Sequence, residues 1–215
     1  YASKPNPDWA KVIQHCDAII NSNYSLLTTF DHLFDNAHEG NAESIWEVNG
    51  QGSGSLINAW CTQVFIGDNW KKFNTPSHTI NNVLDVKRKA TTIKKFPTSF
   101  ADPYWTTFTQ RPYPWKMRKE DGTQNFYIFR LADIILTRAE ALHKLGQTAE
   151  ALVLVNTIRT RAGVTPYDAL TDQLLYEERG REMYAEMTRR QDQIRFGTWD
   201  DAWWEKPAST DTQKL

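Results

Sequence analysis

Apolar residues recur every three or four positions near the start of the chain and again in its last third. Between Asp8 and Ile20 they form a single stripe, with Asn6 and Pro7 ahead of it as start signals and the polar run 21–23 behind it. A stripe with this period predicts an amphipathic helix over residues 8–20. Further on, the alternation in SIWEV at 44–48 predicts a short strand.

The helical period is clearest in FRLADIILTRAEALHKLGQTAEALVLVNTIRTRAG, residues 129–163. We expect two helices there, separated by Gly146, because glycine suits the left-handed backbone of a helix C-cap. Thr148 is the expected N-cap of the second helix, and Gly163 is expected to close it. The two apolar stripes are Leu131, Ile134, Ile135, Ala139, Leu142 and Leu145, then Ala151, Leu152, Val155, Ile158 and Ala162. The short connection makes the two helices antiparallel neighbours.

This pair matches the register of a tetratricopeptide repeat (TPR), a helix pair of about 34 residues. The matching positions are Ile135, Ala139, Leu142, Ala151 and Val155. Arg138 departs from the pattern, which has leucine there. A single repeat cannot bury its own apolar face, so other helices must stack on it. The helices expected over 8–20 and 172–187 are the obvious neighbours.

Opposite charges are dense in YEERGREMYAEMTRRQDQIRFG, residues 176–197. We expect one helix over 172–187, with Glu177 paired to Arg181 and Glu186 paired to Arg190 at i,i+4 spacing. The other charged side chains are expected on its surface, namely Glu178, Arg179, Glu182, Arg189, Asp192 and Arg195. An arginine within reach lowers the pKa of each glutamate, which favours structural ion pairs over proton transfer.

Between residues 49 and 125 the helical period fades, and Gly, Pro, Asn and Trp accumulate. We expect a long excursion of loops and short strands, with one short helix near Thr79–Leu84. Disordered segments are poor in aromatic residues, whereas this one is rich in them, so it should be folded. Its large aromatic residues include Trp60, Trp70, Tyr104, Trp105, Tyr113 and Trp115.

Charge and length exclude several classes of protein. With 25 Lys and Arg against 26 Asp and Glu, the formal net charge is −1, which argues against nucleic acid as a partner. The basic runs 87–89 and 94–95 are expected to be solvated faces. No apolar run approaches the ~20 residues that cross a bilayer, so we expect the chain itself to be soluble. It begins at Tyr1 without an initiator Met or a leader, and we expect it to be a fragment.

No spacing marks a metal site or a catalytic triad. The histidines are His15, His32, His38, His78 and His143. Cys16 and Cys61 lie far apart without a metal-binding motif, which disfavours a disulfide. We therefore expect no catalytic residue, no metal and no other cofactor.

Three motifs in order resemble the SusD/RagB family of outer-membrane nutrient-binding lipoproteins of the Bacteroidetes. They are FRLADIILTRAEALHKLG at 129–146, AEALVLVNTIRTRAG at 149–163 and ERGREMYAEMTRRQDQIRFG at 178–197. The third motif carries Glu178, Arg179, Glu182, Glu186, Arg189 and Asp192. Residues 9–27, 30–48 and the TPSHTI segment at 75–80 are also similar to the family.

The resemblance implies a mostly α fold, a TPR-like α-α superhelix with a long loop-rich aromatic excursion. The whole chain, 1–215, then corresponds to one SusD/RagB-like region. Its parts are a helix and short strand at 8–48, a ligand face at 49–125, TPR-like helices at 126–197 and a tail at 198–215. Family members usually add a leader, a lipid-modified cysteine and further repeats before this region, so membrane attachment would be through a lipid anchor absent from this chain.

The resemblance also implies a function, which is non-catalytic binding of a glycan on the extracellular face of the outer membrane. The glycan would then be imported through a TonB-dependent transporter, and some members take a peptide instead. Sugar rings stack on flat aromatic side chains, and their hydroxyls need directed polar partners. The residues expected to bind ligand are Trp60, Tyr104, Trp105 and Trp115 for stacking, with Asn49, Gln51 and Asp102 as polar contacts. The tryptophans expected to be structural are Trp9, Trp46, Trp199, Trp203 and Trp204.

Two alternatives come from other classes. A glycoside hydrolase on a helical scaffold needs two carboxylates ~5 to 10 Å apart across a cleft. The excursion offers Asp68, Asp85, Asp102, Glu120 and Asp121, but no motif singles out a pair. An intracellular peptide-binding repeat scaffold predicts several tandem repeats, and only one is visible.

Overall fold

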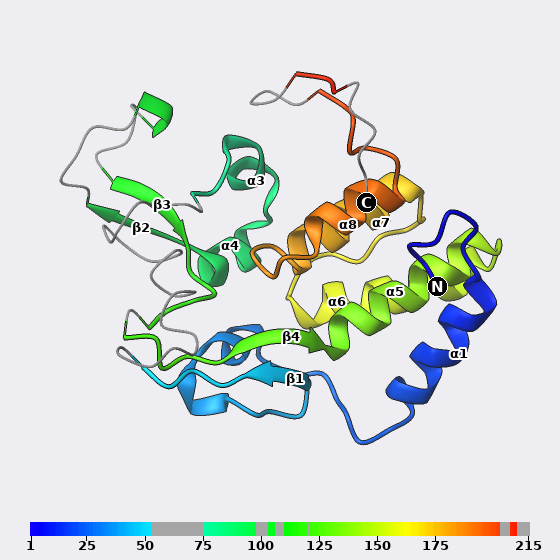
Figure 1. Ribbon diagram of the computed structural model, residues 1–215, viewed down its shortest axis with the longest axis horizontal. Coiled ribbons are helices and arrows are strands. Elements are labelled where there is room, and N and C mark those ends of the chain that lie inside the picture. The colour runs from blue at the N-terminus through cyan, green and yellow to red at the C-terminus, as the bar shows by residue number, and fades with distance from the viewer. Residues whose placement is uncertain (53–74, 98–102, 106–109, 120, 203–206, 210–215) are drawn as a thin grey trace.

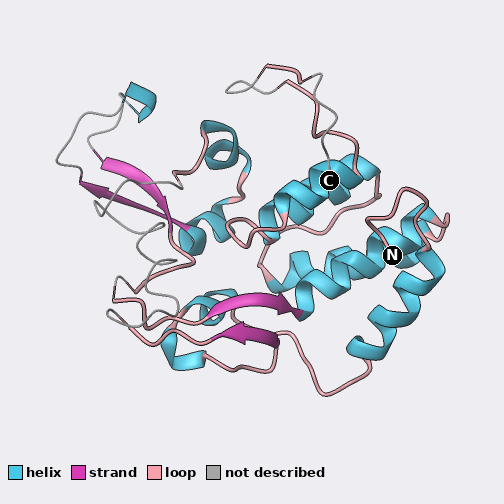
Figure 2. Ribbon diagram, viewed as in Figure 1, coloured by secondary structure: helices cyan, strands magenta, loops and turns pink. Residues whose placement is uncertain are grey.

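The computed structural model describes residues 1–52, 75–97, 103–105, 110–119, 121–202 and 207–209, in which helices predominate (Figures 1 and 2). The α-helices are α1 (Trp9–Ile20), α3 (His78–Val83), α4 (Val86–Thr92), α5 (Leu131–Lys144), α6 (Thr148–Arg161), α7 (Asp172–Glu182) and α8 (Arg189–Arg195). Short 3-10 helices are η1 (Phe30–Phe34), η2 (Asn36–His38) and η3 (Pro103–Trp105). The strands are β1 (Ser44–Val48), β2 (Ile93–Pro97), β3 (Gln110–Pro114) and β4 (Phe126–Arg130).

The helix pair α5–α6 has the predicted antiparallel arrangement and lies at the centre of the largest apolar core. Gly146 and Gly163 end the two helices with φ of +81° and +71°, which confirms their predicted left-handed caps. The expected cap at Thr148 is wrong. Gln147 is the N-cap, and the Thr148 hydroxyl lies 3.0 Å from Nδ1 of His143 instead.

Ala139 and Ala151 are fully buried in this core, where their small size lets α5 and α6 approach closely. Replacing Ala151 with leucine is expected to overpack the contact and to lower the free energy of unfolding by about 1 to 3 kcal/mol. Urea denaturation of the variant measures this, with exposed Val153→Leu on the same helix as the control. A loss no larger than that of the control would contradict the close approach.

The predicted neighbours stack on the pair from two sides, as Figure 1 shows for α1 and α7. Val12 and Cys16 of α1 pack against Ala141 of α5. Arg138 of α5, which departs from the repeat pattern, pairs with Asp17 of α1 at 2.5 Å and with Glu150 of α6 at 2.9 Å. The arginine therefore ties three helices together where a repeat has an apolar contact.

The helix expected over 172–187 is shorter than predicted, because α7 ends at Glu182. Ala185 and Met187 both adopt φ of +63°, a left-handed conformation that an α-helix does not contain. The expected pair of Glu186 with Arg190 does not form. Glu186 points into the core, and Arg190 lies over the Trp199 ring, with its guanidinium carbon 4.9 Å from the ring centroid.

Two small antiparallel sheets complete the described structure, β1 with β4 and β2 with β3. The strand predicted at 44–48 is β1, and its Trp46 pairs with Phe129 of β4. Because β4 runs directly into α5, this sheet is joined to the helical scaffold at Arg130 (Figure 1).

In the excursion, the helix expected near Thr79–Leu84 is α3, while α4 was missed. The basic run 87–89 was expected to be a solvated face, yet Arg88 of α4 is fully buried. In the described part of the chain, no helix combines the length and apolar character needed to cross a membrane.

Candidate functional site

A cavity of about 670 Å³ lies between the segment that contains α3 and the α7–α8 region. One wall comes from residues 75–83 together with Tyr104 of η3. The other comes from α7 and the turn that follows it. The volume falls within the range of about 300 to 1,000 Å³ that is typical of small-molecule sites.

One face of α7 forms its share of the wall, because the cavity-lining residues follow helical spacing. These residues are Gln173, Tyr176, Glu177, Gly180 and Arg181. Gly180 leaves room beside Arg189, since a Cβ at this position would lie 2.8 Å from Nη1 of that arginine. The opposite face of α7 carries Glu178 and Glu182, which are fully buried. The charged residues of α7 thus lie on two faces. Glu177 and Arg181 face the cavity, and Glu178 and Glu182 face the core.

Aromatic and polar side chains meet in the cavity. The rings are those of Tyr104, Tyr176 and Tyr184, and Met183 and Met187 add polarizable apolar surface. The guanidinium carbon of Arg189 lies 3.7 Å from the centroid of the Tyr176 ring. Tyr104 accepts a hydrogen bond of 2.9 Å at its hydroxyl from the backbone N–H of His78, which anchors η3 to the start of α3.

Ion pairing holds the charged groups of the cavity wall in place. Arg181 donates to Glu177 at 2.7 Å, which is the i,i+4 pair predicted from the sequence. Arg181 also donates to the carbonyl of Val83 at 3.0 Å, so it joins α7 to the end of α3. Burial raises the pKa of Glu177, but hydrogen bonds from Gln173 and Arg181 outweigh it, and the pKa lies below its ordinary value. Glu177 is therefore a poor general acid near neutral pH.

Behind α7 lies a set of buried ion pairs that we call the charge cluster. Its basic members are Arg88, Lys116, Arg130, Arg159 and Arg161, and its acidic members are Glu43, Asp85, Glu178, Glu182 and Glu186. Arg130 donates to three carboxylates, those of Glu43 at 2.9 Å, Glu182 at 2.8 Å and Glu186 at 2.6 Å. The cluster joins β4, α4, α6 and α7, and its charges balance.

The cluster also shapes the turn that lines the cavity. Lys116 donates to the carbonyl oxygen of Glu182 at 2.7 Å and pairs with Glu186 in the turn. Glu186 is thereby drawn into the core, and its neighbours Ala185 and Met187 take left-handed conformations that cost energy for non-glycine residues. This exposes Met187 at the cavity. Buried hydrogen bonds and ion pairs therefore stabilise the turn that forms this part of the cavity wall.

Six charged residues of the segment 176–197 were expected on the surface, and this is wrong for four of them, whereas Arg189 is exposed as expected and Arg195 is partly exposed. Glu178, Arg179, Glu182 and Asp192 are all at most 2% exposed. Arg179 donates to Asp133 of α5 at 2.8 Å and to Asp192 of α8 at 2.9 Å, which forms a second buried junction. The expectation of structural pairing rather than catalysis fits this geometry.

The structure places the residues predicted to bind ligand at different locations. Of those it describes, Tyr104 lines the cavity. Trp105 is 1% exposed and packs against His78 at a ring-centroid distance of 3.8 Å, so its ring offers no open face in this structure. Trp115 is half-buried between Phe96 and Lys94 and is not among the residues that line the cavity, although its neighbour Pro114 is. Asn49 and Gln51 are exposed beyond β1, while Trp60 and Asp102 lie outside the described residues.

Sequence reasoning missed the α7 wall and one exposed aromatic pair. Trp46, expected to be structural, is 58% exposed, and its ring lies 6.1 Å from that of Phe129 on the β1–β4 sheet. Alternation along SIWEV indicates which residues share a face of the strand, but not which face is covered. Similarly, the helical spacing of Gln173, Tyr176 and Gly180 was visible, but the segment that faces them was not.

Comparison with known proteins agrees with this architecture. The model of the SusD family matches residues 57–214. The starch-binding protein SusD of Bacteroides thetaiotaomicron is 44% identical over 71 residues, which cover 33% of this chain and 12% of that protein. A SusD-like protein of Formosa agariphila is 26% identical in an alignment 245 residues long, which covers 88% of this chain and 46% of that protein.

Solved structures show the same mostly helical, TPR-like fold. A laminarin-binding SusD-like protein matches with a TM-score of 0.76 and 20% identity, over 97% of this chain and 55% of that one. Surface glycan-binding protein A of Bacteroides thetaiotaomicron in complex with laminarihexaose matches with a TM-score of 0.73 and 18% identity, over 96% and 55%. The chain thus spans about half the length of these relatives or less. Because the family model covers most of its residues, the chain belongs to the SusD family.

Proposed function

We propose that this chain is part of a cell-surface protein that binds a glycan without cleaving it, and that the cavity between α3 and α7 holds a segment of that glycan. The main support for this proposal is the composition of the cavity, where three tyrosines and two methionines lie beside charged and amide side chains. Sugar rings stack on aromatic faces, and their hydroxyls require directed polar partners. Membership of the SusD family and the glycan-binding relatives support the same choice.

Binding is favoured over hydrolysis by the carboxylates at the cavity. A glycoside hydrolase places two carboxyl groups across the scissile bond, and one of them needs a raised pKa to act as the acid. Among the described residues that line the cavity, Glu177 is the one carboxylate, and its pKa is lowered. Incubation of the pure protein with a labelled oligosaccharide should therefore leave the oligosaccharide intact, and release of labelled product would contradict this part of the proposal.

A peptide-binding function is the second candidate within the family. The cavity has a predominantly apolar character, which suits apolar side chains as well as sugar rings. A peptide bound as an added strand would pair its backbone with an exposed strand edge. The described cavity wall is helical, apart from Pro114 at the end of β3 and the loop and turn residues around the helices, which argues against that mode of peptide binding. The glycan-binding relatives favour a glycan as the first candidate.

Isothermal titration calorimetry with a panel that includes laminarihexaose and maltohexaose tests the site. Replacing Tyr104 with alanine is expected to weaken binding of the best oligosaccharide at least tenfold, because a lost stacking partner contributes about 1.4 kcal/mol or more. Tyr104→Phe keeps the ring and should retain most of the affinity. A second variant, Gly180→Phe, places a ring in the cavity from α7 and should also weaken binding.

The matched control is Trp46→Ala, which removes an exposed aromatic residue outside the cavity wall. Its affinity should equal that of the unmodified protein. If Trp46→Ala abolishes binding while both cavity variants bind normally, the ligand lies on the β1–β4 sheet and the proposed location is wrong. If no oligosaccharide binds and a peptide does, the proposed ligand class is wrong.

Delivery of the glycan to a TonB-dependent transporter, at the outer face of the outer membrane, is the remaining part of the proposal. It depends on family membership rather than on a surface of this chain. Affinity purification of the full-length protein from detergent-solubilised native membranes should recover a large outer-membrane barrel. Recovery of the protein from the cytosol, without a barrel, would contradict this part. The predicted roles of Trp60 and Asp102 remain to be tested by the same calorimetry.

A further inference from the structure

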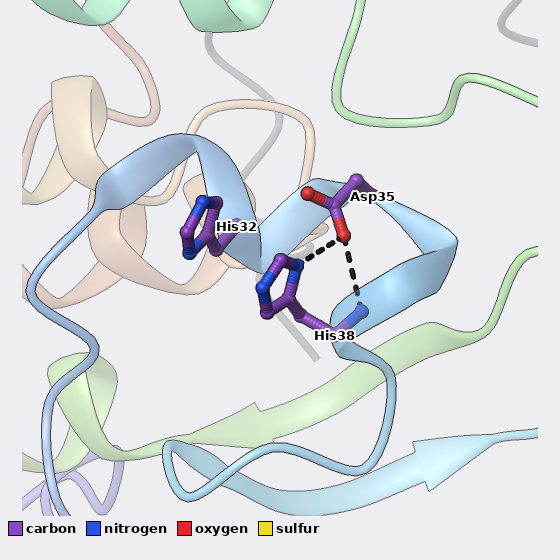
Figure 3. A group of neighbouring side chains, drawn as sticks. All are labelled: His32, Asp35 and His38. Carbon is purple, nitrogen blue, oxygen red and sulfur yellow. Dashed lines mark hydrogen bonds and ion pairs between the residues drawn. The ribbon is translucent and has the colours of Figure 1, made fainter.

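His32, Asp35 and His38 lie together beside η1 and η2, and Figure 3 shows both imidazole rings on the same side of this segment. Their potential ligand atoms all lie within 4.8 Å of one another. The two rings are stacked, with centroids 3.8 Å apart and planes 9° apart. Nδ1 of His38 lies 2.6 Å from Oδ1 of Asp35. Two imidazoles and a carboxylate therefore converge on one small region.

Two short 3-10 helices and the residue between them carry the three side chains. Asp35 itself is extended, with φ of −107° and ψ of 152°, so η1 and η2 are separate turns. His32 is in η1, His38 ends η2 and Asp35 is the N-cap between them, where it accepts the backbone N–H of His38 at 3.0 Å. Metal motifs on an α-helix place ligands four residues apart, which is why sequence spacing did not single out this group.

The donor set has a defined chemical preference. Two imidazole nitrogens and one carboxylate oxygen suit Zn²⁺ and similar divalent transition metals, while Ca²⁺ and Mg²⁺ prefer oxygen ligands. Bonds of about 2.0 to 2.1 Å in a tetrahedral site place the donor atoms about 3.3 Å apart. An imidazole binds an ion in the plane of its ring, so one of the two stacked rings must turn for both nitrogens to face the same ion. The side chains of His38 and Asp35 are 38% and 30% exposed, so an ion has access from solvent.

The segment that carries the three ligands is held on both sides. Phe30, Leu33 and Phe34 of η1 are buried in one apolar cluster. Asp31, next to His32, pairs with Arg118 at 2.6 Å. After η2, the side chain of Asn41 donates to the carbonyl oxygen of His38 at 2.8 Å. A preorganised backbone reduces the entropy that is lost when ligands converge on an ion.

We propose that His32, Asp35 and His38 form a binding site for a divalent transition-metal ion of the Zn²⁺ type. Three protein ligands leave a fourth position for water or another donor. The bound ion clamps η1 to η2 and so stabilises the turn ahead of β1. This site is separate from the cavity and does not depend on glycan binding.

Zn²⁺ titration of the tag-free protein by calorimetry tests the proposal, with Co²⁺ absorption as a second readout. The unmodified protein should bind one equivalent and show the intense visible bands of four-coordinate Co²⁺. His32→Ala and His38→Ala should each weaken Zn²⁺ binding at least 30-fold. Asp35→Asn should weaken it at least tenfold, while its side-chain oxygen still caps η2.

His15→Ala is the matched control, since it removes an exposed histidine of α1 that lies outside this group. Its Zn²⁺ affinity should be unchanged. Zn²⁺ should also raise the thermal unfolding midpoint of the unmodified protein and of His15→Ala, but not of Asp35→Asn. Equal Zn²⁺ affinity in the unmodified protein, His38→Ala and Asp35→Asn would overturn the proposal, as would a midpoint that Zn²⁺ leaves unchanged.

Discussion

Replacing Arg130 with methionine is expected to lower the free energy of unfolding by about 3 to 5 kcal/mol. The guanidinium is fully buried and donates to the carboxylates of Glu43, Glu182 and Glu186. Its removal leaves these carboxylates buried with one positive charge fewer, and water cannot replace the lost hydrogen bonds without opening the core. Urea denaturation at pH 7 measures the loss.

Arg190→Met is the control, because Arg190 is exposed and lies over Trp199. An exposed cation–π contact contributes about 0.5 to 1 kcal/mol, so the free energy of unfolding of this variant should be close to that of the unmodified protein. The double variant Arg130→Met/Glu186→Met restores the charge balance and should recover part of the lost stability. If Arg130→Met lowers the free energy of unfolding no more than Arg190→Met does, the charge cluster does not stabilise the fold.

Acid is expected to unfold the protein through Glu182 and Glu186. Burial raises the pKa of each, but Arg161 and Arg130 outweigh it at Glu182, and Arg130 and Lys116 outweigh it at Glu186. Both pKa values therefore lie below the ordinary 4.5. As the pH falls through 4.5, the unfolded chain binds protons before the folded one, so stability decreases. Each carboxyl therefore contributes stability that is present above the pKa of the unfolded chain and is lost as the pH falls.

Urea midpoints measured from pH 7 down to pH 3 test this expectation. The unmodified protein should lose stability steeply below pH 4.5. Glu186→Gln keeps an acceptor for Arg130 and Lys116 but cannot be protonated in this range, so it should be less stable at pH 7 and should lose less in acid. Glu177→Gln should change the acid dependence less than Glu186→Gln does, because Glu177 is partly exposed and its ion pair is screened by solvent. An acid dependence as steep in Glu186→Gln as in the unmodified protein would contradict the assignment.

The two predictions also bear on the candidate site. Glu182 and Glu186 hold α7 and the following turn, and those segments form one wall of the cavity. A buried ion cluster adds little stability compared with apolar packing, but it accepts only one arrangement of its members. We therefore infer that the cluster fixes the position of the cavity wall. Variants of the cluster that still fold should therefore bind the proposed glycan ligand more weakly than the unmodified protein does.

The helical scaffold of this protein could be predicted from local features of the sequence. The apolar periods of α1, α5 and α6, the glycines at 146 and 163 and the small residues Ala139 and Ala151 are local features, and local features specify helices and their caps. The same motifs indicated the SusD family. Among the described residues that were predicted to bind ligand, Tyr104 is the one in the cavity wall.

The burial of charged residues and the end of α7 depend on contacts between distant parts of the chain. Arg88 and Glu178 are 90 positions apart in the sequence, so nothing local indicated their pairing or the burial of Glu182 and Glu186 with them. The cavity depends on how α3 faces α7. The His32–Asp35–His38 group depends on two short 3-10 helices on either side of Asp35, which apolar periodicity does not predict. Burial and ion pairing require two surfaces in contact. The sequence of one segment shows which side chains are available, but not which other segment covers them.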